Sequence, residues 1–256
     1  MPYAVLNSVL SVTIVSAVSL AGIVVIFFND KYLRNIVFAL VSLSVGVLFG
    51  DVLLHILPDL YKQSANPVLS SVLIFCGILL FFIIEKYLHS EHAHGFHEYE
   101  DPHGHDNNKK ALGPTILAAD TLHNFLDGLI ITASFLAGAR IGLATTLAVV
   151  FHEIPHEIGN VGVLLHAGYS KKRAFTYNVL TALAAFLGLA AAIFFGGTTP
   201  GFTNAALAVA AGGFIYIAGS ELVPELHKES RIKHSFAQLV FILIGFGAMF
   251  AVFAFE

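Results

Sequence analysis

The hexapeptide His152-Glu153-Ile154-Pro155-His156-Glu157 combines two imidazoles and two carboxylates inside an otherwise apolar stretch. In an α-helix, residues four apart lie on one face, so the two histidines share one face and the two glutamates share the next. Imidazole and carboxylate pairs at this spacing are suitable ligands for a divalent first-row metal ion. An acid in the hydrocarbon of a membrane costs roughly 2.5–3.5 kcal/mol on insertion scales, so something must offset that cost. The pattern predicts a metal site on a helix, and the proline predicts a kink beside it, because it frees a carbonyl one turn earlier.

A second polar group lies in the preceding apolar run, which contains Asp120, His123, Asn124 and Asp127. His123 and Asp127 are one helical turn apart, which repeats the ligand spacing of the hexapeptide. Two consecutive spanning helices run in opposite directions, so polar groups at the middle of each should meet near the middle of the membrane. The four first-choice ligands are His123, Asp127, His152 and His156. The residues beside them form a neighbouring second site or hold the ligands in position: Asn124, Glu153 and Glu157.

The composition indicates a membrane environment for these helices. Of the 256 residues, 57% are hydrophobic and only 12% are charged, and the mean hydropathy is +0.80. These values are typical of a polytopic, all-α integral membrane protein and exclude a soluble domain. The net charge of -4 gives no support for nucleic-acid binding, and the single cysteine, Cys76, cannot form an internal disulfide.

Eight apolar runs are each long enough to cross a hydrocarbon layer as a helix, which takes about 20 residues. They cover residues 4–28, 36–58, 68–88, 115–138, 142–167, 174–196, 203–225 and 235–255. All thirteen Lys and Arg residues except Lys62 and Arg140 fall within or next to the loops after the first, third, fifth and seventh runs. By the positive-inside rule these loops are cytosolic and both termini are extracytoplasmic. We expect residues 1–256 to form one transmembrane domain, with the plasma membrane as its location.

The second and seventh runs end in similar segments, which indicates an internal repeat. The second run ends in His55-Ile-Leu-Pro-Asp59-Leu and the seventh in Glu221-Leu-Val-Pro-Glu225-Leu, although so short a match also arises by chance. The first segment faces outside and the second faces the cytosol. An inverted repeat of spans one to three and six to eight around spans four and five, a 3+2+3 arrangement, would produce this orientation. We therefore expect a transporter in which His55 and Asp59 line the entrance and Glu221 and Glu225 line the exit.

A histidine-rich stretch separates the third and fourth runs and forms a predicted cytosolic loop at about 89–112. It has little apolar content and contains His89, His92, His94, His97, His103 and His105, together with acids, Gly and Pro. Such a segment cannot build a core. Because imidazole is a common metal ligand, we expect the loop to capture zinc-like ions in the cytosol. The alternative is a hydrophilic linker without a metal-binding role.

Together these motifs resemble the ZIP (Zrt/Irt-like) family of divalent-metal transporters, and in particular the subfamily whose fifth span carries HEIPHE. Here HEIPHE is the hexapeptide described above, and the fourth-span motif HNxxDG is His123, Asn124, Asp127 and Gly128. The resemblance implies import of zinc, or of iron, manganese or cadmium, into the cytosol through a binuclear site. By motif position it implies a primary site of His123, Asp127, His152 and His156, and a second site that includes Asn124 and Glu153. Many members have Asp where this chain has Asn160.

Two other classes of protein are alternatives. The segment from His152 to His156 also satisfies the HExxH pattern of zinc metalloproteases, in which the Glu acts as general base on a zinc-bound water. Intramembrane proteases of this type have an LDG segment after HExxH, whereas Leu126-Asp127-Gly128 precedes it here. A metal sensor without transport is the other alternative.

The transporter interpretation sets the expected partners. We expect no enzymatic activity and no resident cofactor, because the metal ion is the cargo. Zn²⁺, Fe²⁺, Mn²⁺ and Cd²⁺ all accept imidazole and carboxylate ligands, so the ligand types do not rank them. The expected partners are these divalent ions and the lipid bilayer, with a homodimer as one candidate assembly and no role for nucleic acid.

Overall fold

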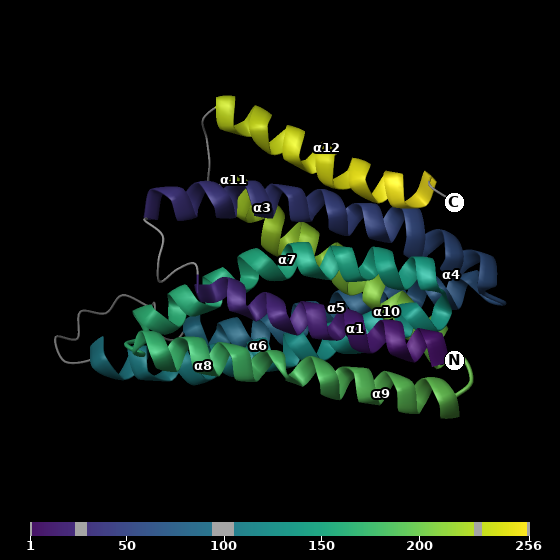
Figure 1. The fold of residues 1–256 in the computed structure, drawn as a ribbon, viewed down its shortest axis with the longest axis horizontal. Coiled ribbons are helices and arrows are strands. Elements are labelled where there is room, and N and C mark those ends of the chain that lie inside the picture. Colours follow the sequence, from purple (N-terminus) through teal and green to yellow (C-terminus); the bar gives the residue numbers. More distant parts are fainter. Residues whose placement is uncertain (1, 24–29, 94–104, 228–231, 255–256) are drawn as a thin grey trace.

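The computed structural model describes residues 2–23, 30–93, 105–227 and 232–254, and all secondary structure within these ranges is helical (Figure 1). The helices lie roughly along one common direction, and the N- and C-termini lie at the same end of the bundle (Figure 1). In chain order the elements are α1 (Pro2–Val18), the 3-10 helix η1 (Ser19–Ile23), α3 (Asp30–Asp51), the π-helix η2 (Val52–Ile56), α4 (Leu57–Gln63), α5 (Pro67–Ala93), α6 (His105–Ala137), α7 (Ala139–His166), α8 (Lys171–Ala182), α9 (Ala184–Thr198), α10 (Phe202–Tyr216), the π-helix η3 (Ile217–Leu222), α11 (Val223–His227) and α12 (Ile232–Ala254).

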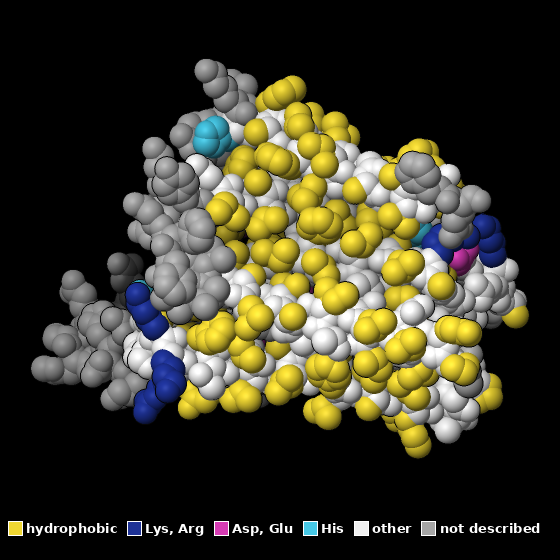
Figure 2. Space-filling view, in the orientation of Figure 1, with side chains coloured by type: hydrophobic (Ala, Val, Ile, Leu, Met, Phe, Trp, Pro, Cys, Tyr) yellow, Lys and Arg dark blue, Asp and Glu magenta, His cyan; other side chains and the backbone are white. Residues whose placement is uncertain are grey.

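Six helical segments in the described part of the chain are long and apolar enough to cross a membrane. They are Pro2–Gly22, Asn35–Gln63, Pro67–Lys86, Lys171–Thr198, Phe202–His227 and His234–Ala254. Hydrophobic side chains cover the middle of the face shown in Figure 2, and Lys and Arg lie towards its two ends. This agrees with the prediction of a multi-pass membrane protein. The predicted count of eight spans depends on α6 and α7, which are 33 and 28 residues long but carry the polar motifs.

The predicted histidine-rich loop is shorter than expected at both of its ends. Helix α5 continues to Ala93 and α6 begins at His105, so the backbone of His89, His92 and His105 is helical. Glu, Lys and His are compatible with a helix once it has left the apolar layer, and the hydropathy pattern alone does not mark where the helix ends. His94, His97 and His103 lie outside the described residues.

The metal-motif helix α6 packs closely against α9 because small residues face each other in the contact. A Cβ atom on Gly128 would collide with the carbonyl oxygen of Ala185, and a Cβ atom on Gly188 would collide with that of Phe125. Each helix therefore presents a glycine to the other helix's backbone, the arrangement that lets membrane helices approach closely. The other main pairings are α3 with α12, α5 with α10, α6 with α7 and α3 with α7.

Each π-helix ends two residues before a proline. Pro58 is the second residue of α4, after η2, and Pro224 is the second residue of α11, after η3. Proline has no N–H for the carbonyl four residues earlier, and its ring crowds that carbonyl. A locally wider π turn is one way to relieve this conflict without ending the helix. The two similar segments found in the sequence therefore share a backbone irregularity as well.

A tight turn brings α8 back along α7. Gly168 has a φ of 89°, and the N–H groups of Gly168 and Tyr169 bond the carbonyls of Leu165 and Leu164, which closes the end of α7. Ser170 then caps α8, and its hydroxyl accepts a hydrogen bond from the N–H of Arg173. This turn places the polar side chains of α8 next to the metal-motif helices.

Candidate metal centre

Four side chains from α6 and α7 bring their ligand atoms together: His123, Asp127, His152 and Glu153, with each pair of ligand atoms within 4.8 Å. We call these residues the ligand group. His123 Nε2 lies 3.1 Å from Glu153 Oε1 and 3.3 Å from His152 Nε2, and His152 Nε2 lies 3.7 Å from Asp127 Oδ2. Zinc bonds of ~2.0–2.1 Å place tetrahedral ligand atoms about 3.3 Å apart. The four atoms therefore have the spacing of a metal site.

The two carboxylates of the ligand group point to a cation. Asp127 Oδ2 and Glu153 Oε1 are buried and receive no well-aligned hydrogen bond from the described residues. Glu153 Oε1 lies 3.1 Å from Nε2 of His123, and Asp127 Oδ2 lies 3.7 Å from Nε2 of His152. Buried carboxylate oxygens without donors are costly unless a positive charge lies beside them. A divalent cation among the four side chains would satisfy both oxygens.

His152 is held in the orientation that a ligand needs. Its Nδ1 lies 3.0 Å from the backbone carbonyl of Ala148, one turn earlier in α7. A carbonyl only accepts, so this hydrogen bond requires the proton on Nδ1. Nε2 then carries a lone pair and faces the ligand group.

Pro155 does not break α7, and the carbonyl it releases has a partner from another helix. The chain is helical from Ala139 to His166, straight through the proline. The carbonyl of Phe151, which Pro155 cannot bond, accepts a hydrogen bond of 2.7 Å from Ser44 Oγ on α3. This bond attaches the hexapeptide helix to α3 one residue before His152.

His156, predicted as a first-choice ligand, lies beside the ligand group. Its ring stacks on that of His123, with centroids 4.6 Å apart and an interplanar angle of 19°. Its Nδ1 lies 3.9 Å from Glu153 Oε1 and 3.8 Å from Asp120 Oδ1. With 31% of its side chain exposed, it forms the boundary between the ligand group and a cavity.

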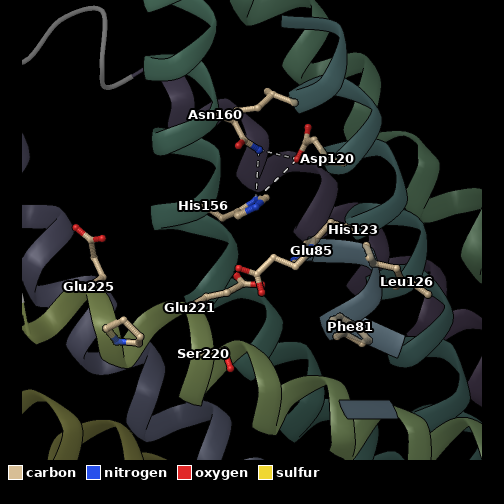
Figure 3. Close-up of a pocket in the computed structure, with 14 residues that line it drawn as sticks. Phe81, Glu85, Asp120, His123, Leu126, His156, Asn160, Ser220, Glu221 and Glu225 are labelled. Carbon is tan, nitrogen blue, oxygen red and sulfur yellow. Dashed lines mark hydrogen bonds and ion pairs between the residues drawn. The ribbon is translucent and has the colours of Figure 1, made fainter. Parts of the chain in front are cut away.

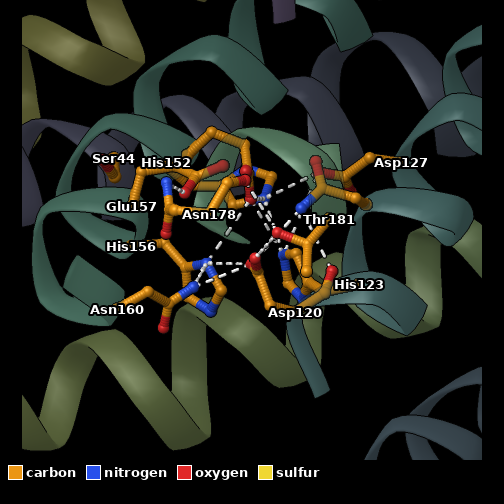
Figure 4. A network of polar contacts seen from close by, with 12 residues as sticks. Ser44, Asp120, His123, Asp127, His152, His156, Glu157, Asn160, Asn178 and Thr181 are labelled. Atoms are coloured by element: carbon orange, nitrogen blue, oxygen red, sulfur yellow. Dashed lines mark hydrogen bonds and ion pairs between the residues drawn. The ribbon is translucent and has the colours of Figure 1, made fainter. Parts of the chain in front are cut away.

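Asn124 and Glu157, also predicted as ligands, are not among the four residues of the ligand group. Asn124 Nδ2 donates to the backbone carbonyl and to Oδ1 of Asp120, at 3.1 and 3.2 Å. Glu157 Oε2 accepts a hydrogen bond of 2.5 Å from Asn178 Nδ2, which comes from α8 (Figure 4). The structure therefore does not bring the carboxylate of Glu157 into the ligand group.

A cavity of roughly 450 Å³ reaches His123 and His156 (Figure 3). Its polar lining consists of Glu85, Asp120, His123, His156, Asn160, Ser220, Glu221 and Glu225. A second cavity of roughly 300 Å³ is lined by His123, His152, His156, Glu221 and Glu225. The two glutamates predicted for the exit thus face cavities that reach the ligand group. Glu85 was not predicted as a site residue, although an acid near the end of an otherwise apolar run could have indicated it.

The residues predicted for the entrance lie apart from both cavities. His55 is buried, with Nδ1 3.7 Å from Asp51 Oδ1 and its ring centroid 6.3 Å from that of Phe253 on α12. Asp59 lies 3.9 Å from Lys62 Nζ at the surface. Neither His55 nor Asp59 lines either cavity.

Comparison with known proteins identifies relatives across the chain. A family model described as ZIP zinc transporter matches residues 3–115 and 96–252. The chain is 30% identical to zinc transporter zipt-7.1 of Caenorhabditis briggsae, over 95% of its own length and 78% of the relative's. It is 30% identical to metal cation symporter ZIP14 of Xenopus tropicalis, over 87% of this chain and 62% of that protein. It is 42% identical to human zinc transporter ZIP6 over 55% of this chain, which is only 20% of that protein's length.

Proposed function

Because the chain belongs to the ZIP zinc transporter family, we propose that it carries divalent metal ions, zinc foremost, across a membrane into the cytosol through the ligand group on α6 and α7. The observation that carries the site assignment is the convergence of two imidazoles and two carboxylates, with no well-aligned hydrogen bond from the described residues to Asp127 Oδ2 or Glu153 Oε1. The set contains no thiolate, which suits an ion that must be released again. The HExxH protease is not favoured, because the family that matches is one of transporters.

The cavities define the proposed route on the cytosolic side. A metal ion leaving the ligand group would pass His156 and then Glu221 and Glu225, which line the same space (Figure 3). Carboxylates along an aqueous cavity offer a cation weak, replaceable contacts once it leaves the tighter site. On the opposite side, we assign the entrance to the region of His55 and Asp59. The basic residues at the loops predicted to be cytosolic support this direction.

The helix pairings support the eight-span, 3+2+3 arrangement that we propose for the whole chain. An inverted repeat relates span two to span seven and span three to span eight, so the pair α3–α12 should have a counterpart in α10–α5. Both pairs are main contacts of the structure. The same relation pairs α7–α1 with α6–α9, and these contacts are also present. The π-helices η2 and η3 occupy matching places in spans two and seven.

Reconstitution of the purified full chain into liposomes that contain a fluorescent zinc indicator tests the proposal. We expect zinc uptake by the wild type, a loss of at least 100-fold in the combined His123→Ala and His152→Ala variant, and normal uptake by Thr132→Ala. The Thr132 hydroxyl is buried on α6 but bonds only the carbonyl of Gly128 in its own helix, so this variant is a matched control. Absence of uptake of any divalent ion by folded wild type would refute transport, and uptake by the double variant would refute the site.

A further inference from the structure

Asp120 is a buried carboxylate that accepts hydrogen bonds from three different helices. It lies on α6, one turn before His123, and is 2% exposed. Oδ1 accepts from Asn160 Nδ2 of α7 at 2.7 Å and from Asn124 Nδ2 of α6 at 3.2 Å. Oδ2 accepts from the hydroxyl of Thr181 on α8 (Figure 4). Both oxygens are thus occupied by donors, and Asp120 is not among the residues of the ligand group.

These bonds fix the orientation of the two amides. An Asn side chain can present either NH₂ or C=O in a given direction, and the acceptor beside it decides which. Because Asp120 only accepts when it is ionised, it turns both NH₂ groups towards itself. The carbonyl oxygen of Asn124 consequently faces away from Asp120.

The fixed amide of Asn160 reaches His156. Its Nδ2 lies 3.3 Å from Nδ1 of His156 as well as 2.7 Å from Asp120. When Nδ1 of His156 accepts this second bond, the single proton of the neutral ring is on Nε2, so the bond fixes the tautomer of His156. Asp120 therefore acts on His156 through Asn160, and the His156 ring in turn stacks on His123 of the ligand group.

We propose that Asp120 is a positioning residue for metal binding: it orients Asn124 and, through Asn160, His156, at the boundary between the ligand group and the cytosolic cavity. Thr181 extends this role to α8, because its bond to Asp120 holds α8 against the same point. This inference rests on the proposed transport site. It adds a residue that the ligand pattern does not contain and assigns it no direct contact with the ion.

The test compares Asp120→Asn with Asn160→Ala. In Asp120→Asn, an NH₂ group replaces one acceptor oxygen and faces donors, so the amides lose their fixed orientation. Asn160→Ala removes the amide that reaches His156 and leaves the bonds of Asp120 to Asn124 and Thr181 in place. We expect Asp120→Asn to weaken zinc binding about 10–100-fold, the range typical of partners that orient metal ligands. We expect a smaller loss, about 10-fold, in Asn160→Ala, which leaves Asn124 oriented.

Two measurements on the purified full chain compare these variants with the wild type. Zinc affinity in detergent is taken from competition with a chromophoric zinc indicator, and KM and maximal rate come from uptake in liposomes. We expect the KM of Asp120→Asn to rise with its affinity loss while the maximal rate changes little, a split that a merely misfolded protein would not produce. If Asp120→Asn does not fold, Asn160→Ala keeps the bonds of Asp120 to α6 and α8 and should still weaken zinc binding about 10-fold.

Wild-type zinc affinity in Asp120→Asn, or in Asn160→Ala where Asp120→Asn does not fold, would overturn the proposal. If the wild type binds zinc without transporting it, the proposed function is refuted. The zinc affinities of the variants then still show whether Asp120 positions the metal site.

Discussion

The hydrogen bond from Ser44 to the Phe151 carbonyl permits a sharp test of how the hexapeptide helix is held. Ser44 is 0% exposed, and its hydroxyl lies 2.7 Å from two carbonyls, those of Leu40 in its own helix and Phe151 in α7. The Leu40 carbonyl can also be bonded by the backbone N–H of Ser44. The Phe151 carbonyl has no such alternative, because Pro155 lacks an N–H. Ser44→Ala therefore leaves a buried carbonyl without a donor.

The expected cost follows from these partners. A buried polar group left without a hydrogen bond costs ≈ 1–3 kcal/mol, and hydrogen bonds between membrane helices measure about 0.6 kcal/mol on average and at most about 1.7. We expect Ser44→Ala to lower the free energy of unfolding by about 1–2 kcal/mol, near the top of the membrane range because no other donor replaces the hydroxyl. For a chain of this size that corresponds to a thermal midpoint lower by about 2–8 °C.

Ser42→Ala is the matched control for this substitution. Ser42 is also 0% exposed on α3, but its hydroxyl donates only to the Phe38 carbonyl of its own helix, at 2.8 Å. That carbonyl can keep a backbone donor after the substitution, so we expect a change within about 0.5 kcal/mol. The assay is the thermal unfolding of purified protein in detergent, followed by intrinsic tyrosine fluorescence or by circular dichroism.

Pro155→Ala supplies the second half of the test. Alanine restores an N–H that can bond the Phe151 carbonyl, so the Ser44 hydroxyl is no longer needed there. We expect Ser44→Ala to cost much less in the Pro155→Ala background than in the wild type, which makes the two changes non-additive. Equal midpoints for Ser44→Ala and Ser42→Ala, or full additivity with Pro155→Ala, would refute the reasoning.

Three further comparisons test other parts of the molecule. Glu153→Gln removes a ligand oxygen and should weaken zinc binding 10–100-fold in the competition titration. Glu157→Gln changes a carboxylate that is bonded to α8 and should weaken zinc binding far less. Equal losses in the two variants would contradict the placement of Glu153 inside the ligand group and Glu157 outside it. Gly188→Ala drives a Cβ into the backbone of α6 and should destabilise by about 1–3 kcal/mol, while Gly197→Ala enters open space and should leave the thermal midpoint unchanged. Glu221→Gln should lower the maximal uptake rate with little change in zinc affinity, and a large affinity loss would place Glu221 in binding instead of release.

The sequence predicted which helices carry the site better than which side chains meet. The i,i+4 rule assigned the two histidines of the hexapeptide to one face and the glutamates to the next. In the structure, His152 and Glu153 converge with the α6 residues, and His156 lies at the edge. Spacing along one helix defines its faces, but the rotation of α7 relative to α6 decides which neighbouring positions point at the partner. That rotation depends on long-range packing, such as the glycine contact between α6 and α9.

The contribution of α8 illustrates what the pattern of motifs cannot contain. Asn178 and Thr181 are isolated polar residues in the apolar run at 174–196, and each is fully compatible with an ordinary interhelical hydrogen bond. Only the fold shows that Asn178 bonds Glu157 and that Thr181 bonds Asp120. A polar residue in a spanning helix indicates that it has a hydrogen-bond partner, but the sequence alone does not identify that partner.

Asp120 and Asp127 show how one helix uses the same buried side chain in two ways. Both lie on α6, two turns apart, and both are 2% exposed. Asp120 receives donors on both oxygens, from α6, α7 and α8. Asp127 Oδ2 receives no well-aligned hydrogen bond from the described part of the chain and lies 3.7 Å from His152 Nε2. A carboxylate whose oxygens already accept hydrogen bonds gains little from a bound cation. A buried carboxylate oxygen without such hydrogen bonds is stabilised strongly by a cation beside it. The difference between the two aspartates thus follows from their neighbours, and it separates the residue that orients the site from the residue that binds the ion.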